Sequence, residues 1–195
     1  TKEHMLRQKA CTREAAARIL AASVVADLLP SISGISNCDI IVEGPDGVKL
    51  LREGYHPHRG GVIVVQKNEA QEVYWSEGVE ALKAILSDFN FQTEADRSRA
   101  VASFLTPALR FGGHLSSSIP IDVAEANESQ SGKTYRQKVL AATYAQSPEL
   151  VTQVRGVGGG DEPFFSALSR GKPFIQFDNV RSRMDSPTLE AFVTA

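Results

Sequence analysis

Residues 125–134 read EANESQSGKT, and the last three, Gly132-Lys133-Thr134, are the residues with which a phosphate-binding P-loop ends. The full pattern has a glycine five places before Gly132, where this chain has Asn127. Asparagine tolerates left-handed backbone angles better than most non-glycine residues, so the departure is mild. The stretch predicts a phosphate cradle; the alternative is a polar loop that caps a structural helix and leaves Lys133 in solvent.

The sequence around this loop predicts alternating strands and helices. The expected elements are a strand at 118–124, a helix from 133 to about 146, a strand at 150–154, a helix at 161–170, a strand at 174–177 and a last helix from Ser186-Pro187. Strand, loop, helix, strand, helix, strand is the order of an α/β protein with a parallel sheet. The fold class that we predict is a P-loop NTPase core preceded by a small α+β segment.

The segment before this core has a different pattern. Residues 12–29 are alanine-rich with apolar positions at helical spacing, and four β-like runs, CDIIVEG, VKLLREG, GVIVVQK and EVYWS, follow between turn signals. We expect a small antiparallel sheet or meander, then helices at 79–87 and 94–110. Thr93 and Asp96 resemble a capping box for the second helix, and Pro107 is expected to kink it.

These patterns predict two parts. Residues 1–88 would form an N-terminal helix plus a small β-rich segment, and residues 89–195 the P-loop core, with the boundary near 88–93 or 111–118. Cys11 and Cys38 lie far apart without CxxC spacing, which favours reduced thiols over a disulfide between them.

Composition sets limits on partners and location. The chain has 195 residues, of which 42% are hydrophobic, and a net charge of −2, so it can bury a core and has no overall charge that attracts nucleic acid or membrane. No apolar stretch reaches the roughly 20 residues that span a bilayer. We expect a cytoplasmic protein without a membrane partner.

The predicted cradle assigns a role to each loop residue. Consecutive backbone amides and the helix dipole bind the phosphates, the lysine amine reaches the β- and γ-phosphates, and the threonine hydroxyl binds magnesium. The nucleotide-binding residues would be Asn127, Glu128, Ser129, Gln130, Ser131, Gly132, Lys133 and Thr134. The expected cofactors are ATP and Mg²⁺. Lys133 would also act as a catalytic residue.

A second motif follows the cradle at the distance that such a core requires. Residues 173–179, PFIQFDN, form an apolar strand that ends on Asp178, the candidate second magnesium ligand. The alternative is an ordinary capping aspartate. Many ATPases continue with a glutamate that polarises water, but here Asn179 follows. Glu162 or Asn179 would then position the water, while Asp161 is more typical of a helix cap.

Residues 86–195 contain the segments DFNFQTEADRSRAVASFLTPALR, PIDVAEANESQSGKTYRQKVLAATY and GGDEPFFSALSRGKPFIQFDNVRSRMDSPTLEAFVTA. In their order and in the ending FDN…DSPTLEAFVT they resemble a group of phage and prophage replication ATPases. These are primase–helicase-like proteins with a P-loop core akin to AAA+ and superfamily 3 helicases. The resemblance implies ATP hydrolysis with magnesium in a helicase-like or DNA-loading step of phage or mobile-element replication.

The resemblance also implies partners and a missing part. The partners would be DNA, single-stranded or at a replication fork, and further copies of the chain in a homo-oligomer, in a bacterial or phage-infected cell. A full core of this kind has two more strands, with a sensor residue and often an arginine finger, so we expect a chain truncated at its C-terminus. Arg181 and Arg183 are expected to be exposed loop charges rather than DNA contacts.

Two other functions stay open. A degenerate, non-catalytic P-loop module that serves assembly or DNA binding is favoured by Asn127, Asn179 and the missing strands. A small-molecule kinase would share the cradle, but no acceptor-pocket motif or lid supports it.

Two further motifs are assigned to ordinary structure. Residues 55–59, YHPHR, place two histidines two apart, as a metal site on a strand would, but no further ligand joins them and a solvated turn is the better interpretation. Tyr74 and Trp75 are expected at a core or rim position rather than in a base-stacking site.

Overall fold

The computed structural model describes residues 10–65, 71–116, 118–128, 131–152, 161–178, 180 and 186–194, to which all structural statements below refer. In chain order the elements are α1 (Arg13–Leu20), α2 (Ser23–Leu28), β1 (Gly34–Ser36), β2 (Ile40–Gly44), β3 (Gly47–Leu51), β4 (Gly54–His56), the 3-10 turn η1 (His58–Gly60), β5 (Val62–Val64), α3 (Trp75–Ile85), α4 (Glu94–Phe111), α5 (Lys133–Thr143), β6 (Glu149–Thr152), α6 (Asp161–Ser169), β7 (Ile175–Asp178) and α7 (Pro187–Thr194). The chain is therefore a mixed α/β protein. No helix in its described part is long and apolar enough to cross a membrane.

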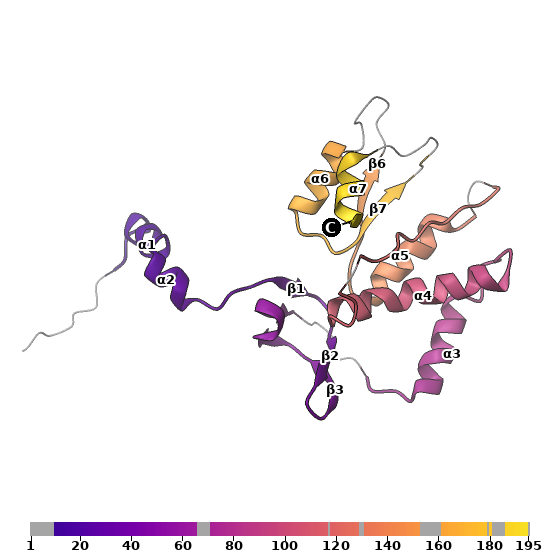
Figure 1. Ribbon diagram of the computed structural model, residues 1–195, viewed down its shortest axis with the longest axis horizontal. Coiled ribbons are helices and arrows are strands. Elements are labelled where there is room, and N and C mark those ends of the chain that lie inside the picture. The colour runs from indigo at the N-terminus through magenta and orange to yellow at the C-terminus, as the bar shows by residue number, and fades with distance from the viewer. Residues whose placement is uncertain are drawn as a thin grey trace, which may run out of the picture.

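The N-terminal helical stretch is two short helices rather than the single helix predicted for 12–29. Thr12 caps α1 by accepting a hydrogen bond from the Ala15 amide at 3.2 Å. Ala22 has extended backbone angles and separates α1 from α2. Neither helix buries a residue, and the pair lies apart from the rest of the chain (Figure 1). Propensity alone stabilises a helix of this length only marginally, and packing supplies most helical stability in proteins. Because neither helix buries a residue against another element, nothing holds residues 12–29 in one continuous helix.

The β-rich part consists of two small sheets. Strands β2 and β3 form the predicted antiparallel hairpin, in which Gly44 pairs with Gly47 across the turn. The second sheet has the order β1-β5-β4, with β4 antiparallel to β5 and β1 parallel to it, so the predicted meander is only partly right. A buried apolar cluster holds the two sheets together: Ile40, Val42, Leu51 and Val64.

The helices α3, α4 and α5 form a second buried cluster, whose central residues are Leu86, Ala100, Phe104 and Leu140. The predicted strand EVYWS is wrong, because Tyr74 instead caps α3: the Glu77 carboxylate accepts a hydrogen bond from the Tyr74 amide at 3.1 Å. α4 begins as predicted, with the Asp96 amide donating to Thr93 Oγ1 at 3.2 Å.

Phe111 connects the β-rich part with the helices. Its ring packs against the apolar cluster of the two sheets. It also meets Tyr144 edge-on, with ring centroids 5.8 Å apart, and Phe174 in the same way at 6.1 Å. One aromatic side chain at the end of α4 therefore touches both parts of the molecule.

The Tyr144 hydroxyl is inserted into the backbone of α4. It donates a hydrogen bond to the Phe104 carbonyl and accepts one from the Ala108 amide at 3.2 Å. Those two groups would otherwise bond to each other in a regular helix. Pro107, beside them, lacks an amide hydrogen, and α4 continues through it to Phe111. Insertion of a side chain is one recognised way in which a helix accommodates such a break.

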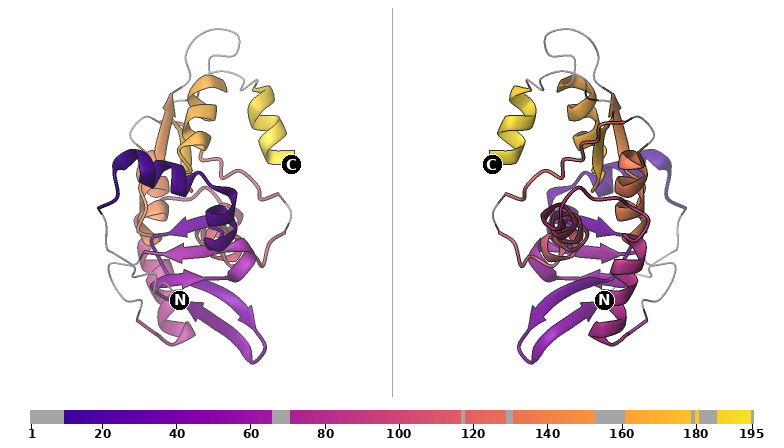
Figure 2. Two further views of the ribbon diagram at one scale, coloured as in Figure 1. Left: turned by 90° about the vertical axis from the view of Figure 1, so that its left-hand side faces the viewer. Right: turned by 90° about the vertical axis from the view of Figure 1, so that its right-hand side faces the viewer.

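The C-terminal part is built on the parallel pair β6–β7, covered by α6 and α7. Phe164 is buried on α6, with its ring centroid 5.4 Å from that of Phe177 and 5.6 Å from that of Phe192. Seen from either side, α6 and α7 stand at the end of the molecule opposite the β2–β3 hairpin (Figure 2). α7 begins after Ser186, as predicted.

The strand predicted at 118–124 is wrong. The described residues between 118 and 126 form no regular element. Pro120 offers no amide hydrogen to a neighbouring strand, and Ile121 and Val123 are 54% and 72% exposed instead of packed in a core. The parallel sheet among the described residues therefore has two strands, and the larger sheet of a P-loop core stays a prediction.

We expect Tyr144→Phe to lower the free energy of unfolding by about 1–3 kcal/mol, because the Ala108 amide and the Phe104 carbonyl lose the group that lies between them. Chemical denaturation by urea, followed by circular dichroism, measures this change. Phe165→Leu, at an exposed position on α6, is the control and should change little.

Alkaline pH gives a second measurement of the same contact. Burial raises the pKa of the Tyr144 hydroxyl above its usual value. Because the pKa is higher in the folded state, the hydroxyl makes its full contribution to stability below the unfolded-state pKa of about 10. This contribution is lost as the pH rises through the folded-state pKa. The stability difference between the wild type and Tyr144→Phe should therefore narrow above about pH 10. A constant difference would contradict the buried hydroxyl.

Candidate phosphate-binding site

The candidate site begins at Gly132, the residue that opens α5. Gly132 has a φ of +84°, a left-handed conformation that glycine adopts without strain. Its carbonyl accepts the first helical hydrogen bond, from the Arg136 amide at 2.9 Å. A side chain here would also approach Phe89, whose ring lies 3.4 Å from the position of a Cβ atom. The left-handed turn is what favours glycine here, since the distance to Phe89 is an ordinary van der Waals contact.

Thr134 and Asp178 meet although they are 44 positions apart in the chain. The Thr134 hydroxyl, in the first turn of α5, donates a hydrogen bond to Asp178 Oδ1 at 3.0 Å. Asp178 is the last residue of β7, and Thr152, the last residue of β6, pairs with it. The structure thus brings together the two residues predicted to bind magnesium, at the carboxyl end of the parallel strands.

The Lys133 amine folds back over the loop that precedes it. It donates to the Glu128 carbonyl at 3.4 Å and to Ser131 Oγ at 3.2 Å. Both partners are neutral oxygens, and among the described residues the amine forms no ion pair with a carboxylate. An incoming phosphate oxygen can replace either of these contacts, and it forms the stronger hydrogen bond because it is charged.

An ion pair between a buried arginine and a half-buried aspartate ties the two ends of the loop together. Arg136, on α5, is only 6% exposed. Its Nη2 donates to both carboxylate oxygens of Asp122, at 2.9 and 2.7 Å, and its Nη1 donates to Ser103 on α4 at 3.1 Å. Asp122 precedes the loop and Arg136 follows it, so this pair fixes the span that the loop must cover.

Sequence reasoning missed this pair, although a signal for it existed. Arg136 lies four residues before Leu140, which is buried, so helical spacing puts the arginine on the inner face of α5. A guanidinium on an inner face needs an acidic partner, and Asp122 is one of the acids closest in sequence on the N-terminal side of the loop.

Two aromatic rings lie beside the loop. Tyr135, directly after Thr134, is 65% exposed and stacks on Phe89, with ring centroids 6.3 Å apart and an angle of 27° between the planes. Phe89 also packs on the cluster of α3, α4 and α5. The sequence analysis did not find this pair, because nothing local indicates that residue 89 returns to residue 135.

The other predicted site residues are less closely placed. Asn127 and Glu128 are exposed, and Asn127 does not use the left-handed angles that asparagine permits, since the non-glycine residues with positive φ in the described chain are Arg59 and Ala145. Ser129, Gln130, Asn179, Arg181 and Arg183 lie outside the described residues.

The two candidates at the start of α6 differ. The Asp161 carboxylate accepts a hydrogen bond from Ser186, whose hydroxyl also accepts from the Leu189 amide at 3.1 Å and so caps α7. Asp161 thus joins α6 to α7. Glu162 is exposed, and its role in positioning water stays a prediction.

The oxygen donors at this site fit magnesium. A threonine hydroxyl and a carboxylate are hard ligands of the kind that Mg²⁺ prefers, with water and phosphate oxygens completing the shell. Groups of three or more His, Cys, Asp or Glu side chains that could hold a metal without such help are absent from the described residues. His56 and His58 form no such group, and His56 Nε2 bonds to the Arg52 carbonyl at 2.6 Å.

We expect Arg136→Met to lower the free energy of unfolding by about 1–3 kcal/mol, because it removes the charge-assisted hydrogen bonds to the Asp122 carboxylate, which is itself 31% exposed. The double variant with Asp122→Asn should lose less than the two single losses added together, since no unpaired charge remains. Urea unfolding of all four proteins gives the coupling energy, expected at about 1–3 kcal/mol. Strict additivity would show that the pair does not act as a unit.

Comparison with known proteins identifies no family. Neither the protein-family models, nor the curated proteins, nor the solved structures gave a match. The functional assignment of this chain therefore depends on its own residues and their geometry.

Proposed function

We propose that the chain binds ATP with Mg²⁺ at the N-terminus of α5 and hydrolyses it. The observation that carries this proposal is the hydrogen bond of 3.0 Å between the Thr134 hydroxyl and Asp178 Oδ1. A helix-capping loop has no need of an acid from the end of a parallel strand. A magnesium site beside a phosphate cradle needs that arrangement.

Each residue of the site has a role in this proposal. The amides at the start of α5 and the helix dipole bind the phosphate oxygens, and Gly132 lets the backbone approach them. The Lys133 amine leaves Glu128 and Ser131 and pairs with the β- and γ-phosphates. Thr134 and Asp178 would hold the magnesium ion, which supplies charge neutralisation for phosphoryl transfer. Glu162 or Asn179 would orient the attacking water.

The wider role rests on the resemblance alone. We propose a helicase-like or DNA-loading ATPase of phage or mobile-element replication, acting on single-stranded DNA or a fork as a homo-oligomer in the cytoplasm. The segments that support this role are those around EANESQSGKT and PFIQFDN.

The alternative is a degenerate P-loop module that binds nucleotide without turnover. Two observations favour it: Glu162 is exposed, and the Asp161 carboxylate already accepts a hydrogen bond from Ser186. Turnover measured with and without single-stranded DNA separates the two functions, because the module would bind ATP and release no phosphate.

We expect Lys133→Ala to weaken binding of magnesium-ATP by about tenfold or more, because it removes a charge-assisted contact worth about 1.5–3 kcal/mol. Isothermal titration calorimetry measures the dissociation constant. The matched control is Lys138→Ala, an exposed lysine on the same helix, which should bind as the wild type does. Equal binding by the Lys133 and Lys138 variants would contradict the cradle.

We expect Asp178→Asn to reduce the effect of magnesium on ATP affinity, because the neutral amide is a weaker ligand for the ion than the carboxylate. The measurement compares ATP titrations with magnesium and with EDTA for the wild type and the variant. In EDTA the two proteins should bind ATP alike, whereas in magnesium the variant should bind it more weakly. A loss of the same size in both buffers would indicate a structural role for Asp178.

A further inference from the structure

A cavity of about 390 Å³ lies between the three-stranded sheet and the C-terminal end of α4. Its lining includes Ser33, His58, Arg59, Arg110 and Gln146. Among the described residues that line it, two are arginines, one is a histidine and none is a carboxylate. In a chain with a net charge of −2, this is a local concentration of positive charge.

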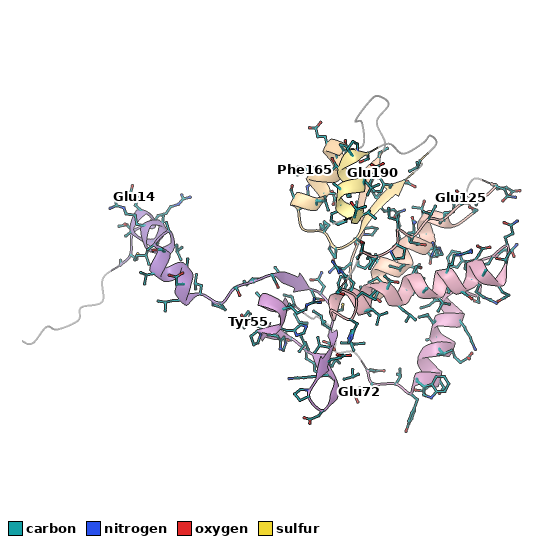
Figure 3. All side chains as sticks on the ribbon, in the orientation of Figure 1. Glu14, Tyr55, Glu72, Glu125, Phe165 and Glu190 are labelled. Atoms are coloured by element: carbon teal, nitrogen blue, oxygen red, sulfur yellow. The ribbon has the colours of Figure 1, made fainter. Side chains whose placement is uncertain are left out.

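The cavity is separate from the candidate phosphate site. Tyr55 lies on β4, three residues before His58, and Glu125 lies at the start of the loop before α5. Figure 3 shows these two residues far apart on the molecule. The described residues of the predicted cradle, 127–128 and 131–134, do not line the cavity. An anion bound here would therefore not be the triphosphate of the proposed ATP site.

Arg59 is held in an unusual backbone conformation. Its φ is +47°, in the left-handed region that side chains other than glycine and asparagine seldom adopt. Ser33 Oγ donates to the Arg59 carbonyl at 3.0 Å and fixes it there. The guanidinium lies directly over Gly113, where a Cβ atom would stand 1.9 Å from Nη1. Such retained strain is typical of functional positions.

His58 contributes a buried polar atom without a partner. Its Nε2 is shielded from solvent and has no hydrogen-bond partner within the described part of the chain. A buried group of this kind is rare in native proteins and calls for an explanation, such as a ligand. An anionic oxygen in the cavity would accept a hydrogen bond from it.

Arg110 approaches from the other side. It lies in the last turn of α4, and its Nη1 donates to the Leu115 carbonyl at 3.0 Å. A position near a helix C-terminus suits an arginine for electrostatic reasons alone, so Arg110 by itself indicates nothing. What indicates a binding site is that Arg110, Arg59 and His58 line the same cavity. Asp39 precedes the lining residue Ile40, but its carboxylate does not line the cavity.

We propose that this cavity binds a phosphate group, carried either by a nucleic-acid backbone or by a small phosphorylated molecule. Two guanidinium groups and an imidazole present planar, directional donors that match phosphate oxygens. The volume is that of a small-ligand pocket, and a backbone phosphate with its sugar is within that size. The site also gives a role to the YHPHR stretch, which the ATP site does not use.

The test uses the full chain carrying Lys133→Ala, so that the proposed ATP site cannot contribute. Two probes are titrated without magnesium: inorganic pyrophosphate by calorimetry and a fluorescein-labelled oligothymidylate by anisotropy. In this background Arg59→Asn removes one charge while keeping a residue that tolerates positive φ, and Arg110→Gln removes the other. The matched control is Arg99→Gln. Arg99 lies on α4, as Arg110 does, and forms an ion pair with Asp96.

We expect at least one probe to bind, and each cavity variant to weaken that binding by about tenfold or more while Arg99→Gln leaves it unchanged. Binding of the oligothymidylate alone assigns the phosphate to a nucleic-acid backbone; binding of pyrophosphate alone assigns it to a small molecule. Circular dichroism confirms that the variants fold. Failure of both probes to bind, or equal binding by the cavity variants and the control, overturns the proposal.

The result is independent of ATP binding. If Lys133→Ala does not alter ATP affinity but the cavity variants lose phosphate binding, the ATP site fails and the cavity stands. The imidazole resonances of His58 give a further measurement, because they should shift when the binding probe is added and stay in place in Arg59→Asn.

Discussion

The candidate site depends on one ion pair, that of the buried Arg136 guanidinium with Asp122. The guanidinium is enclosed by α5, by α4 through Ser103, and by the chain that enters the loop. A buried charge is costly unless it is fully paired, so the three segments have little freedom to separate. The first turn of α5, with Thr134, is thereby held where β7 delivers Asp178.

Much of the fold was predictable where the determining signal is local. The hairpin at 40–51 follows from its turn, and α4 and α7 begin where Thr93 and Ser186 cap them. The failures at 12–29 and 118–124 have one physical cause. An apolar pattern tells which face would be buried, but it does not tell whether another element is there to bury it.

The candidate site, like the fold, has parts that the sequence predicts and parts that it does not. The meeting of Thr134 with Asp178 could be anticipated, because the P-loop pattern puts these residue types at fixed points of a helix and a strand. The Arg136 pair and the cavity at Arg59 depend on contacts between segments far apart in the chain. A single sequence carries only indirect signals of such contacts, such as an arginine on an inner helical face.

The inserted Tyr144 hydroxyl has an evolutionary consequence. Because it bridges an amide and a carbonyl of α4 beside Pro107, the residue that caps the end of α5 shares a structural task with α4. A descendant chain that replaced the tyrosine would retain a broken helix with nothing to satisfy it, and one that replaced the proline would relieve the need for the hydroxyl. Tyr144 should therefore be replaced only in chains that have already lost Pro107, although 36 residues separate the Ala108 amide from its partner.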